Sequence, residues 1–207
     1  MLDKIILQVR KPTGLLGRLM ARGMNINHRK LTDWGLEFIN KNDIKNILDI
    51  GCGGGRTIKR LSVLSPNSNV YGIDYSKESI NISARVNKKS IKNGRVILKE
   101  SNVSSLPFED SYFDLIVAIE SYFFWPDLGN DINEVLRVLK KNGIFLIISG
   151  EYKNDKSDKR NKSFVEKLNM HYHSPEDIYN LLFNSGFKNI KINEKYENGW
   201  LFVISEK

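Results

Sequence analysis

Short apolar runs alternate with helical patterns through the centre of the chain. A short apolar run predicts a strand, whereas apolar residues three or four apart predict the buried face of a helix. The predicted strands are residues 47–50, 69–73, 95–99, 114–119 and 144–148. The run at 114–119 is almost wholly apolar, which is typical of a strand that is covered on both faces. Strands that alternate with helices predict parallel pairing with right-handed crossovers.

The helices and their ends follow from the same pattern. Three buried faces are predicted, made of Ile58, Leu61 and Leu64; of Ile80, Ala84, Asn87 and Ile91; and of Leu128, Ile132, Val135, Leu136 and Leu139. Asn142-Gly143 is expected to end the third of these helices. Ser174-Pro175-Glu176-Asp177 is typical of a helix start, with a serine cap and a proline in the first turn. Residues 187–193 and 200–205 predict an antiparallel hairpin that is joined at Asn198-Gly199.

The regions before and after this alternating core, which spans residues 46–150, differ in character. Residues 1–45 are too few for a domain and are interpreted as an N-terminal helical cap. Leu31, Trp34, Phe38 and Ile39 predict a helix in this cap, with Thr32 or Asp33 as its N-cap. Residues 151–207 contain a polar excursion followed by the last helix and the hairpin. We interpret residues 1–207 as a single domain.

Composition and charge add modest limits. A chain of 207 residues with 41% hydrophobic and 27% charged residues is ordinary for a soluble globular domain. The single cysteine, Cys52, excludes an internal disulfide framework, and no apolar run is long enough for a membrane span, so a cytoplasmic protein is expected. The net charge of +8 permits a nucleic-acid partner, but the lysines are spread along the whole chain.

A glycine cluster directly after the first strand marks the expected ligand site. The stretch 46–56 reads as strand, glycine turn and helix start, with glycines at the alternate positions Gly51, Gly53 and Gly55. Glycines allow a tight turn and a close approach of a ligand to the backbone. The dinucleotide pattern requires a glycine where this chain has Arg56, and the Gly-Lys-Ser/Thr of a phosphate-binding Walker loop is absent.

The pattern Asp49-x-Gly51-x-Gly53-x-Gly55 resembles motif I of the class I S-adenosylmethionine (SAM) methyltransferases. Residues 46–150 carry this resemblance. It implies an α/β, Rossmann-like sheet of seven strands in the order 3-2-1-4-5-7-6, with the last strand antiparallel and helices on both faces. In the family, an N-terminal helical segment folds over the site as a lid. Residues 12–40 therefore form either such a lid or helices that only cover one sheet face.

The resemblance also assigns the cofactor contacts. Asp74 ends the second strand, where an acid can accept both hydroxyls of a ribose, and this is the position of the SAM ribose in the family. Asp49 would orient the glycine loop, which includes Cys52, and face the methionine end of SAM. Tyr75 is expected to pack on the adenosine or in the core. Ser76 is counted with these contacts and is also expected to cap the next helix.

Two further segments complete the expected site. Ser101-Asn102-Val103 resembles the family segment that holds adenine, with Asn102 in place of the usual aspartate and Val103 beside it. The side-chain amide oxygen of Asn102 can accept the same hydrogen bond from the exocyclic amine of adenine. Glu120 follows the fourth strand, in a segment that resembles motif IV. It is a candidate for the SAM amino group or for the substrate, and the alternative is a helix cap or a surface acid.

The acceptor side is predicted from aromatic residues and histidines. Four consecutive aromatic residues, at positions 122–125, cannot all face one core, so Tyr122, Phe124 and Trp125 are expected to line a substrate cavity. His28 is the preferred candidate for a general base because it lies in the predicted lid, with Asn27 beside it; His171 is the second choice, and either could be structural. No histidine or cysteine has metal-ligand spacing, so no metal is expected.

The expected reaction is methyl transfer from SAM to a small-molecule acceptor by in-line displacement, leaving S-adenosylhomocysteine (SAH). Enzymes that methylate exocyclic or amide nitrogens carry Asn/Asp-Pro-Pro-Tyr after the fourth strand, and this chain does not, so that class is disfavoured. Methylation of cytosine at C5 uses a cysteine nucleophile and is also disfavoured, because Cys52 is expected to be held in the cofactor loop. The net charge of +8 keeps an RNA or protein methyltransferase open as an alternative. A non-catalytic SAM-binding protein is the other alternative. No membrane partner is expected, nucleic acid is disfavoured, and the protein is expected to be a monomer or a homodimer.

Overall fold

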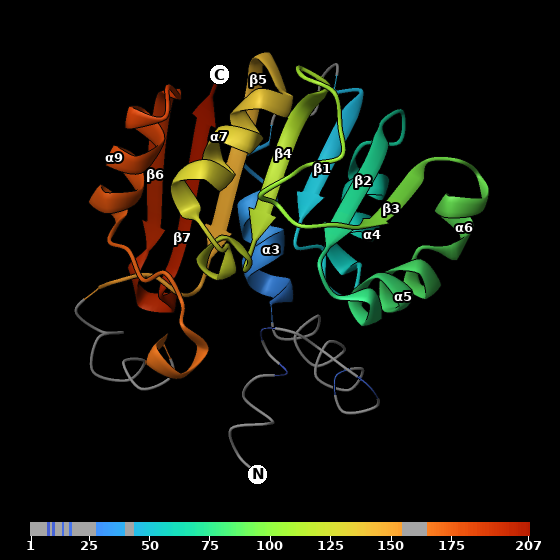
Figure 1. Cartoon of the computed structure of the whole chain (residues 1–207), viewed down its shortest axis with the longest axis horizontal. Coiled ribbons are helices and arrows are strands. Elements are labelled where there is room, and N and C mark those ends of the chain that lie inside the picture. The colour runs from blue at the N-terminus through green and yellow to red at the C-terminus, as the bar shows by residue number, and fades with distance from the viewer. Residues whose placement is uncertain are drawn as a thin grey trace.

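The computed structural model describes residues 8, 10, 14, 17, 28–39, 44–154 and 165–207. These residues form one seven-stranded sheet in the order β3-β2-β1-β4-β5-β7-β6, as Figure 1 shows. The predicted strand order is confirmed. The strands are β1 (Asn46–Ile50), β2 (Asn69–Asp74), β3 (Val96–Glu100), β4 (Phe113–Ile119), β5 (Leu139–Ser149), β6 (Lys188–Lys195) and β7 (Trp200–Glu206).

Strand direction sets where a site can form. β1 pairs in parallel with β2 and β4, and β2–β3 and β4–β5 are also parallel. β7 is antiparallel to both of its neighbours, β5 and β6, which confirms the predicted hairpin. The carboxyl ends of β1, β2 and β4 therefore meet at one edge of the sheet, where their arrowheads lie in Figure 1. In open α/β sheets, ligands bind at this edge.

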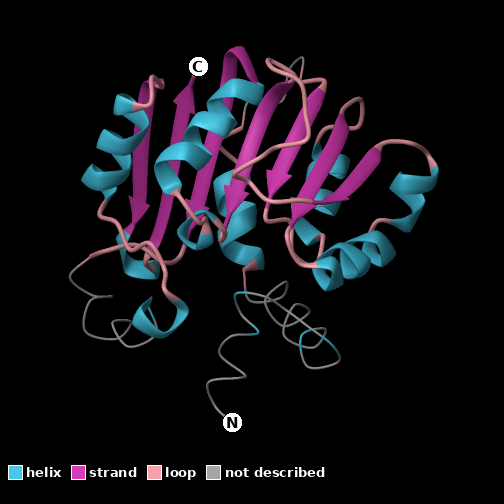
Figure 2. Ribbon diagram, viewed as in Figure 1, coloured by secondary structure: helices cyan, strands magenta, loops and turns pink. Residues whose placement is uncertain are grey.

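Helices cover both faces of the sheet (Figure 2). They are α3 (Arg29–Leu36), α4 (Arg56–Leu64), α5 (Lys77–Val86), α6 (Lys88–Lys92), α7 (Leu128–Val138) and α9 (Pro175–Asn184), with the short turns η1 (Tyr122–Phe124) and η2 (Tyr196–Asn198). Buried residues of α3 and α4 belong to one apolar cluster, whereas those of α7 and α9 belong to a second. Because β4 contributes buried residues to both clusters, it is apolar along most of its length. Among the described residues, no helix is both long and apolar enough to cross a membrane.

The expected helix end at Asn142-Gly143 is wrong. α7 ends at Val138, and β5 begins at the next residue, so Asn142-Gly143 lies within the strand. Asn142 has φ of 61°, and the register between β4 and β5 shifts at this point. A left-handed residue and a glycine here form an irregularity inside the strand, and the backbone of Lys207 holds it with two hydrogen bonds of 3.1 Å.

Two helix predictions also need correction. The helix expected over residues 80–91 is two helices, α5 and α6, which meet at Asn87. The predicted caps Thr32 and Asp33 lie inside α3, which has His28 at its N-cap position without a side-chain cap hydrogen bond. Sequence spacing alone could not reveal the break between α5 and α6. Asn87 continues the spacing of the apolar face, but its side chain forms a hydrogen bond to the carbonyl of Gly55.

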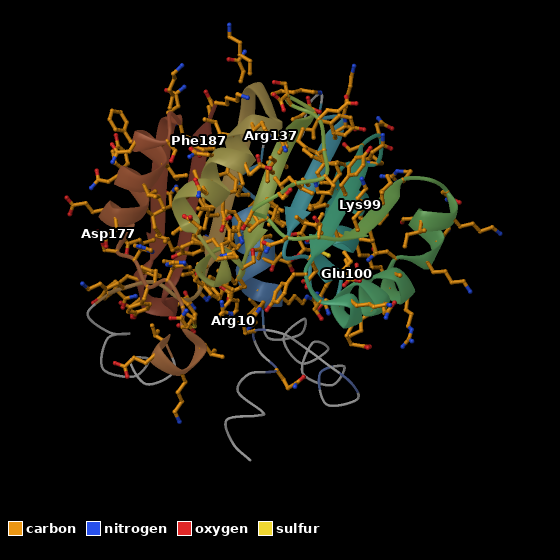
Figure 3. The ribbon with its side chains drawn as sticks, in the orientation of Figure 1. Arg10, Lys99, Glu100, Arg137, Asp177 and Phe187 are labelled. Carbon is orange, nitrogen blue, oxygen red and sulfur yellow. The ribbon has the colours of Figure 1, made fainter. Side chains whose placement is uncertain are left out.

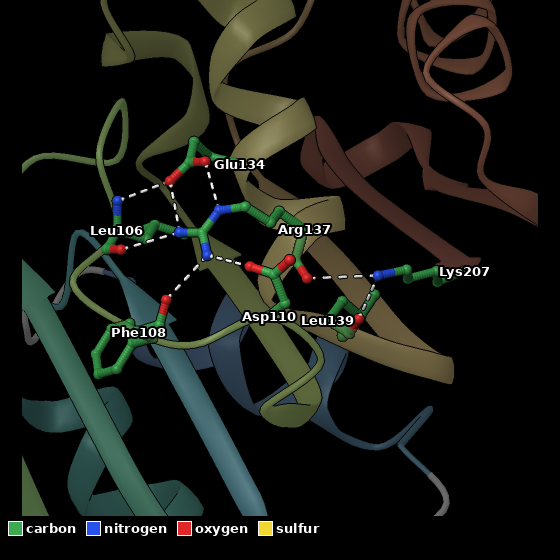
Figure 4. A network of polar contacts seen from close by, with 7 residues as sticks. All are labelled: Leu106, Phe108, Asp110, Glu134, Arg137, Leu139 and Lys207. Atoms are coloured by element: carbon green, nitrogen blue, oxygen red, sulfur yellow. Dashed lines mark hydrogen bonds and ion pairs between the residues drawn. The ribbon is translucent and has the colours of Figure 1, made fainter.

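An arginine network fixes the long connection between β3 and β4 (Figure 4). The guanidinium of Arg137, on α7, pairs with Glu134 and Asp110, with nitrogen–oxygen distances of 2.7 Å to each. It also donates to the carbonyls of Leu106 and Phe108, both at 3.0 Å. Charge-assisted, bidentate bonds of this kind are among the strongest polar contacts in proteins. These bonds attach the connection between β3 and β4, which contains no helix or strand, to α7. The attached part follows Asn102 and Val103 in the sequence.

Candidate functional site

A cavity of about 870 Å³ lies at the carboxyl edge of the parallel strands. Its wall brings together the glycine loop, the end of β2, the segment after β3 and the residues that follow β4. Helices α3 and α4 and the aromatic segment of η1 close the remaining sides. The cavity thus joins the segments that the sequence predicted to meet, apart from the part of the N-terminal cap that lies outside the described residues.

The glycine loop is shaped by hydrogen bonds to β2. The amides of Gly51 and Cys52 both donate to the carbonyl of Ile73 at 2.9 Å. Gly51 has φ of 76°, and a Cβ there would lie 2.6 Å from the Cβ of Ser121. Gly53 has φ of 49°, yet a Cβ there would meet no atom nearer than 4.0 Å. The loop therefore needs Gly51 for packing, whereas Gly53 presents bare backbone to the cavity.

The back of the loop rests on α5. A Cβ at Gly55 would lie 2.2 Å from the hydroxyl oxygen of Ser83, and Gly55 does not line the cavity. The side-chain amide of Asn87 donates to the carbonyl of Gly55 at 2.9 Å. Asn87 is thus a buried support of the loop that the sequence analysis missed. Its position in an apparent apolar stripe was the only signal, since an asparagine there needs a polar partner.

Asp74 accepts two backbone hydrogen bonds where the predicted ribose site lies. Its two carboxylate oxygens accept from the amides of Gly53, at 2.9 Å, and of Ser76, at 2.8 Å. Asp74 lines the cavity and is largely buried, and burial raises its pKa although these amides oppose the rise. Its carboxylate therefore joins the glycine loop to the start of α5. Ser76 is buried, does not line the cavity, and caps α5 by accepting from the amide of Ser79.

Asp49 lies behind the glycine loop rather than in the cavity wall. It is 1% exposed, and its Oδ2 is buried without a hydrogen-bond partner among the described residues. Burial, with a contribution from the charge of Asp74, raises the pKa of Asp49 to about 8. A buried acid that lacks a partner favours a nearby positive charge.

These features fit the cofactor that the sequence predicts. The open backbone at Gly53 leaves room for a bound ligand, the carboxylate of Asp74 can accept hydroxyl groups, and the buried acid Asp49 complements a positive charge. Asn102 and Val103 also line the cavity. The amide oxygen of Asn102 accepts from the amide and hydroxyl of Ser104 at 3.2 and 3.4 Å, which fixes its side chain.

Arg10, which is labelled in Figure 3, lines the cavity. Its carbonyl accepts from the hydroxyl of Tyr75, which lines the cavity and is 40% exposed. Its guanidinium donates to the carbonyl of Leu168 at 3.0 Å. Arg10 therefore links the end of β2 to the residues before α9. Burial raises the pKa of Tyr75 to about 12, so its hydroxyl stays protonated.

Glu120 and His28, the two predicted catalytic residues, meet at the cavity wall. His28 Nε2 lies 3.4 Å from Glu120 Oε2. The other carboxylate oxygen of Glu120 accepts a hydrogen bond from the amide of Gly150. Burial raises the pKa of Glu120 to about 7 and lowers that of His28. The pair spans from the start of α3 to the ends of β4 and β5, and the side chain of Glu120 is only 11% exposed, so Glu120 is not a surface acid.

The aromatic segment is divided between the core and the cavity. Phe124 and Trp125 line the cavity as predicted, and Phe123, which was not predicted, lines it as well. Tyr122 does not line the cavity: it is 1% exposed and packs in the core, so its predicted contact with substrate is not supported by its position. The 3-10 turn η1 places successive side chains on different sides, which the sequence could not reveal.

His171 supports this wall from outside. It does not line the cavity, contrary to expectation; instead, its amide donates to the carbonyl of Phe123, and its Nε2 lies 2.8 Å from the carbonyl of Trp125. Ser121, which the sequence analysis missed, lines the cavity and donates to the carbonyl of Ile50 at 2.6 Å. Asn27 and most of the predicted lid lie outside the described residues. Within the described residues, no group of three His, Cys, Asp or Glu could hold a metal ion.

Comparisons with known proteins agree with this geometry. Residues 48–147 match the family described as methyltransferase domain. The chain is 25% identical over 170 residues to the uncharacterized methyltransferase YdaC of Bacillus subtilis, covering 81% of this chain and 89% of YdaC. It is 34% identical over 100 residues to 24-methylenesterol C-methyltransferase 2 of Oryza sativa, covering 48% of this chain but only 27% of the rice protein.

A solved structure supports the fold. The crystal structure of a proposed SAM-dependent methyltransferase of Methanococcus maripaludis matches with a TM-score of 0.69 and 25% identity. The match covers 92% of this chain and 93% of that protein. The sequence and the fold of this chain are therefore both similar to those of methyltransferases.

Proposed function

The chain belongs to the class I SAM-dependent methyltransferases, and from this premise we propose that it transfers the methyl group of SAM to a small-molecule acceptor. One observation carries the proposal: a single cavity of about 870 Å³ contains both the glycine loop with Asp74 and the apolar wall of Phe123, Phe124 and Trp125. A cofactor and an acceptor can therefore share one enclosed space. When bound, SAM supplies an activated methyl group on a sulfonium.

The cofactor half of the cavity would be used as follows. Gly53 and its neighbours bind the methionine portion through bare backbone, and Asp74 accepts the ribose hydroxyls. Val103 packs on the adenine, and the amide oxygen of Asn102, which has a second lone pair, accepts from its amine. Asp49 stabilises the positive end of the cofactor from behind the loop. The main tasks of these residues are to align the methyl group with the acceptor and to exclude water. Together these effects can lower the activation barrier by several kcal/mol.

The acceptor half favours a small molecule. Aromatic side chains and Met170 form an apolar wall that excludes water, and Arg10 lines the same cavity. The rice relative is named for methylation of a sterol, which is a compact apolar acceptor. An RNA or protein methyltransferase and a non-catalytic SAM-binding protein are the alternatives. A cytoplasmic location and a monomeric or homodimeric state are further parts of the proposal, which fractionation and light scattering would test.

Calorimetry with SAM and SAH tests the cofactor half. We expect the wild type to bind both, and Asp74→Ala to weaken binding by about 1.5–3 kcal/mol, because a charge-assisted acceptor is lost. Asp177→Ala is the matched control, since it removes an aspartate that also supports a helix start, on α9 and away from the cavity (Figure 3). Equal affinities for the wild type and Asp74→Ala would refute the ribose role. A wild type that binds neither ligand would refute the proposal as a whole.

Turnover separates the three candidate functions. Pools of small molecules, total RNA and protein extract are each incubated with SAM, and SAH formation is measured. SAH formed only with small molecules supports the proposal. Salt-sensitive turnover with RNA supports the first alternative, because phosphate contacts weaken steeply with salt. SAM binding without turnover in any pool supports the non-catalytic alternative.

A further inference from the structure

We propose that His28 is the general base of this site, that Glu120 positions its ring, and that the acceptor is an apolar molecule with a phenolic or enolic hydroxyl. The inference rests on the proposed function and names the class of acceptor for the same cavity. It is carried by a contact that the sequence could not show: Glu120 is engaged by His28 and by the backbone of Gly150. Both carboxylate oxygens of Glu120 thus have a partner within the protein, which favours a positioning role over a contact with the amino group of SAM.

Glu120 is held in one orientation. It has φ of 55°, which is rare for a residue with a side chain and persists only where the surroundings enforce it. Its amide donates to the carbonyl of Ile148 at 2.9 Å, and its carboxylate accepts from the amide of Gly150 on the same neighbouring segment. The backbone thus directs one carboxylate oxygen to Gly150 and the other toward His28.

His28 is placed to receive a proton. It lines the cavity at the start of α3, and its side chain is 38% exposed. Nε2 faces Glu120, and Nδ1 has no hydrogen-bond partner among the residues that the structure describes. A carboxylate that accepts from Nε2–H fixes the tautomer in which Nδ1 carries a free lone pair. The distance of 3.4 Å is long for a hydrogen bond, and such contacts often tighten only when substrate is bound.

The groups that line the cavity decide which acceptors fit. Burial lowers the pKa of His28, so the ring is neutral near pH 7 and able to accept a proton. Glu151, at the end of β5, also lines the cavity, and Tyr122 lies close enough for the charge of Glu120 to affect its hydroxyl. Cationic side chains, including Arg10, Arg29 and Arg60, also line the cavity, so the acceptor class follows from its aromatic wall and not from charge. The aromatic wall favours an uncharged, apolar acceptor.

The proton balance then follows from the pair. As the acceptor oxygen bonds to the methyl carbon, the carbon–sulfur bond breaks and its electron pair stays on sulfur. The hydroxyl proton passes to Nδ1 of His28, so the positive charge moves from sulfur to the imidazolium, beside the carboxylate of Glu120. Water takes the proton after product release. A phenol or an enol needs this step because it is mostly protonated at neutral pH.

Nitrogen NMR of the labelled histidines tests the pair without turnover. In the wild type at pH 8, we expect His28 to carry its proton on Nε2 and to have an unprotonated Nδ1. Glu120→Gln should abolish this preference, whereas Glu151→Gln, the same change at the same cavity, should preserve it. His28→Gln assigns the signals against those of His171 and His173. A proton on Nδ1 of wild-type His28, or an unchanged tautomer in Glu120→Gln, would overturn the proposal.

Turnover distinguishes the failure of this inference from that of the proposed function. SAH formation is measured with matched pools of phenols, amines and carboxylic acids. We expect turnover in the phenol pool, a loss of about 10²–10⁴-fold in His28→Gln, a smaller loss in Glu120→Gln, and unchanged SAM affinity in both. The rate with wild type should rise with pH through about 7, the pKa of Glu120, and Glu120→Gln should lack this rise.

Each other outcome has a definite meaning. A wild type that does not bind SAM refutes the proposed function. SAM binding with turnover confined to amines or carboxylic acids, or full activity in His28→Gln, refutes the base and its acceptor class while the proposed function stands. If no pool turns over, the proposed acceptor class is refuted, and the NMR result decides whether Glu120 positions His28.

Discussion

Replacing Asp49 by asparagine should stabilise the ligand-free protein, and increasingly so as the pH rises. The carboxyl of Asp49 is buried in β1, and one of its oxygens has no partner among the described residues. Burial raises its pKa from 3.8 to about 8. In the unfolded chain the group ionises near pH 4, so folding must keep a proton on Asp49 that the unfolded chain has already lost.

The sign and size follow from this difference in pKa. Because the folded pKa is raised, the stability linked to Asp49 is complete below about pH 4 and is lost as the pH rises toward about 8. The loss is about 1.4 kcal/mol for each pH unit in this range. Asparagine has nearly the same shape and no charge. Between pH 5 and pH 8, the free energy of unfolding of Asp49→Asn should therefore gain about 4 kcal/mol relative to the wild type.

Urea denaturation, followed by tryptophan fluorescence at several pH values, measures this difference. Asp114→Asn is the control, because desolvation there is outweighed by Lys140 and two backbone amides, which lower the pKa of Asp114. Its cost should be constant between pH 5 and pH 8. A constant difference for Asp49→Asn as well would mean that Asp49 is ionised in the folded protein, and would refute the reasoning.

Two further substitutions test the supports of the cavity. Gly51→Ala should lower the free energy of unfolding by about 1–3 kcal/mol, because φ is 76° and the new methyl would lie 2.6 Å from the Cβ of Ser121; an unchanged urea midpoint would contradict this. Arg137→Met should destabilise by about 2–4 kcal/mol and weaken SAM binding, since the connection that follows Asn102 and Val103 loses its anchor. Arg137→Lys should rescue it only in part, because lysine cannot form the paired contacts with Glu134; full rescue would show that charge alone suffices.

The arrangement of the cofactor half could be predicted because its information is local. Gly51, Gly53 and Asp74 follow directly after strands, so the spacing of apolar residues places them at the carboxyl edge. The strand order followed from the resemblance together with the alternating pattern. Asn87 and the irregularity at Asn142 were predicted wrongly because the role of each depends on a residue distant in the sequence. Asn87 bonds to Gly55, and Asn142 bonds to Lys207.

The acceptor half was decided only by the tertiary structure. The sequence supplied His28, Glu120 and the run of aromatic residues as candidates, but not the contact between His28 and Glu120, nor that Tyr122 faces the core and Phe123 the cavity. Periodicity along the chain fixes which residues are buried together, because backbone hydrogen bonding imposes the repeat of each helix and strand. Contacts between irregular segments obey no repeat, since they depend on how close the folded core brings segments that are distant in the sequence.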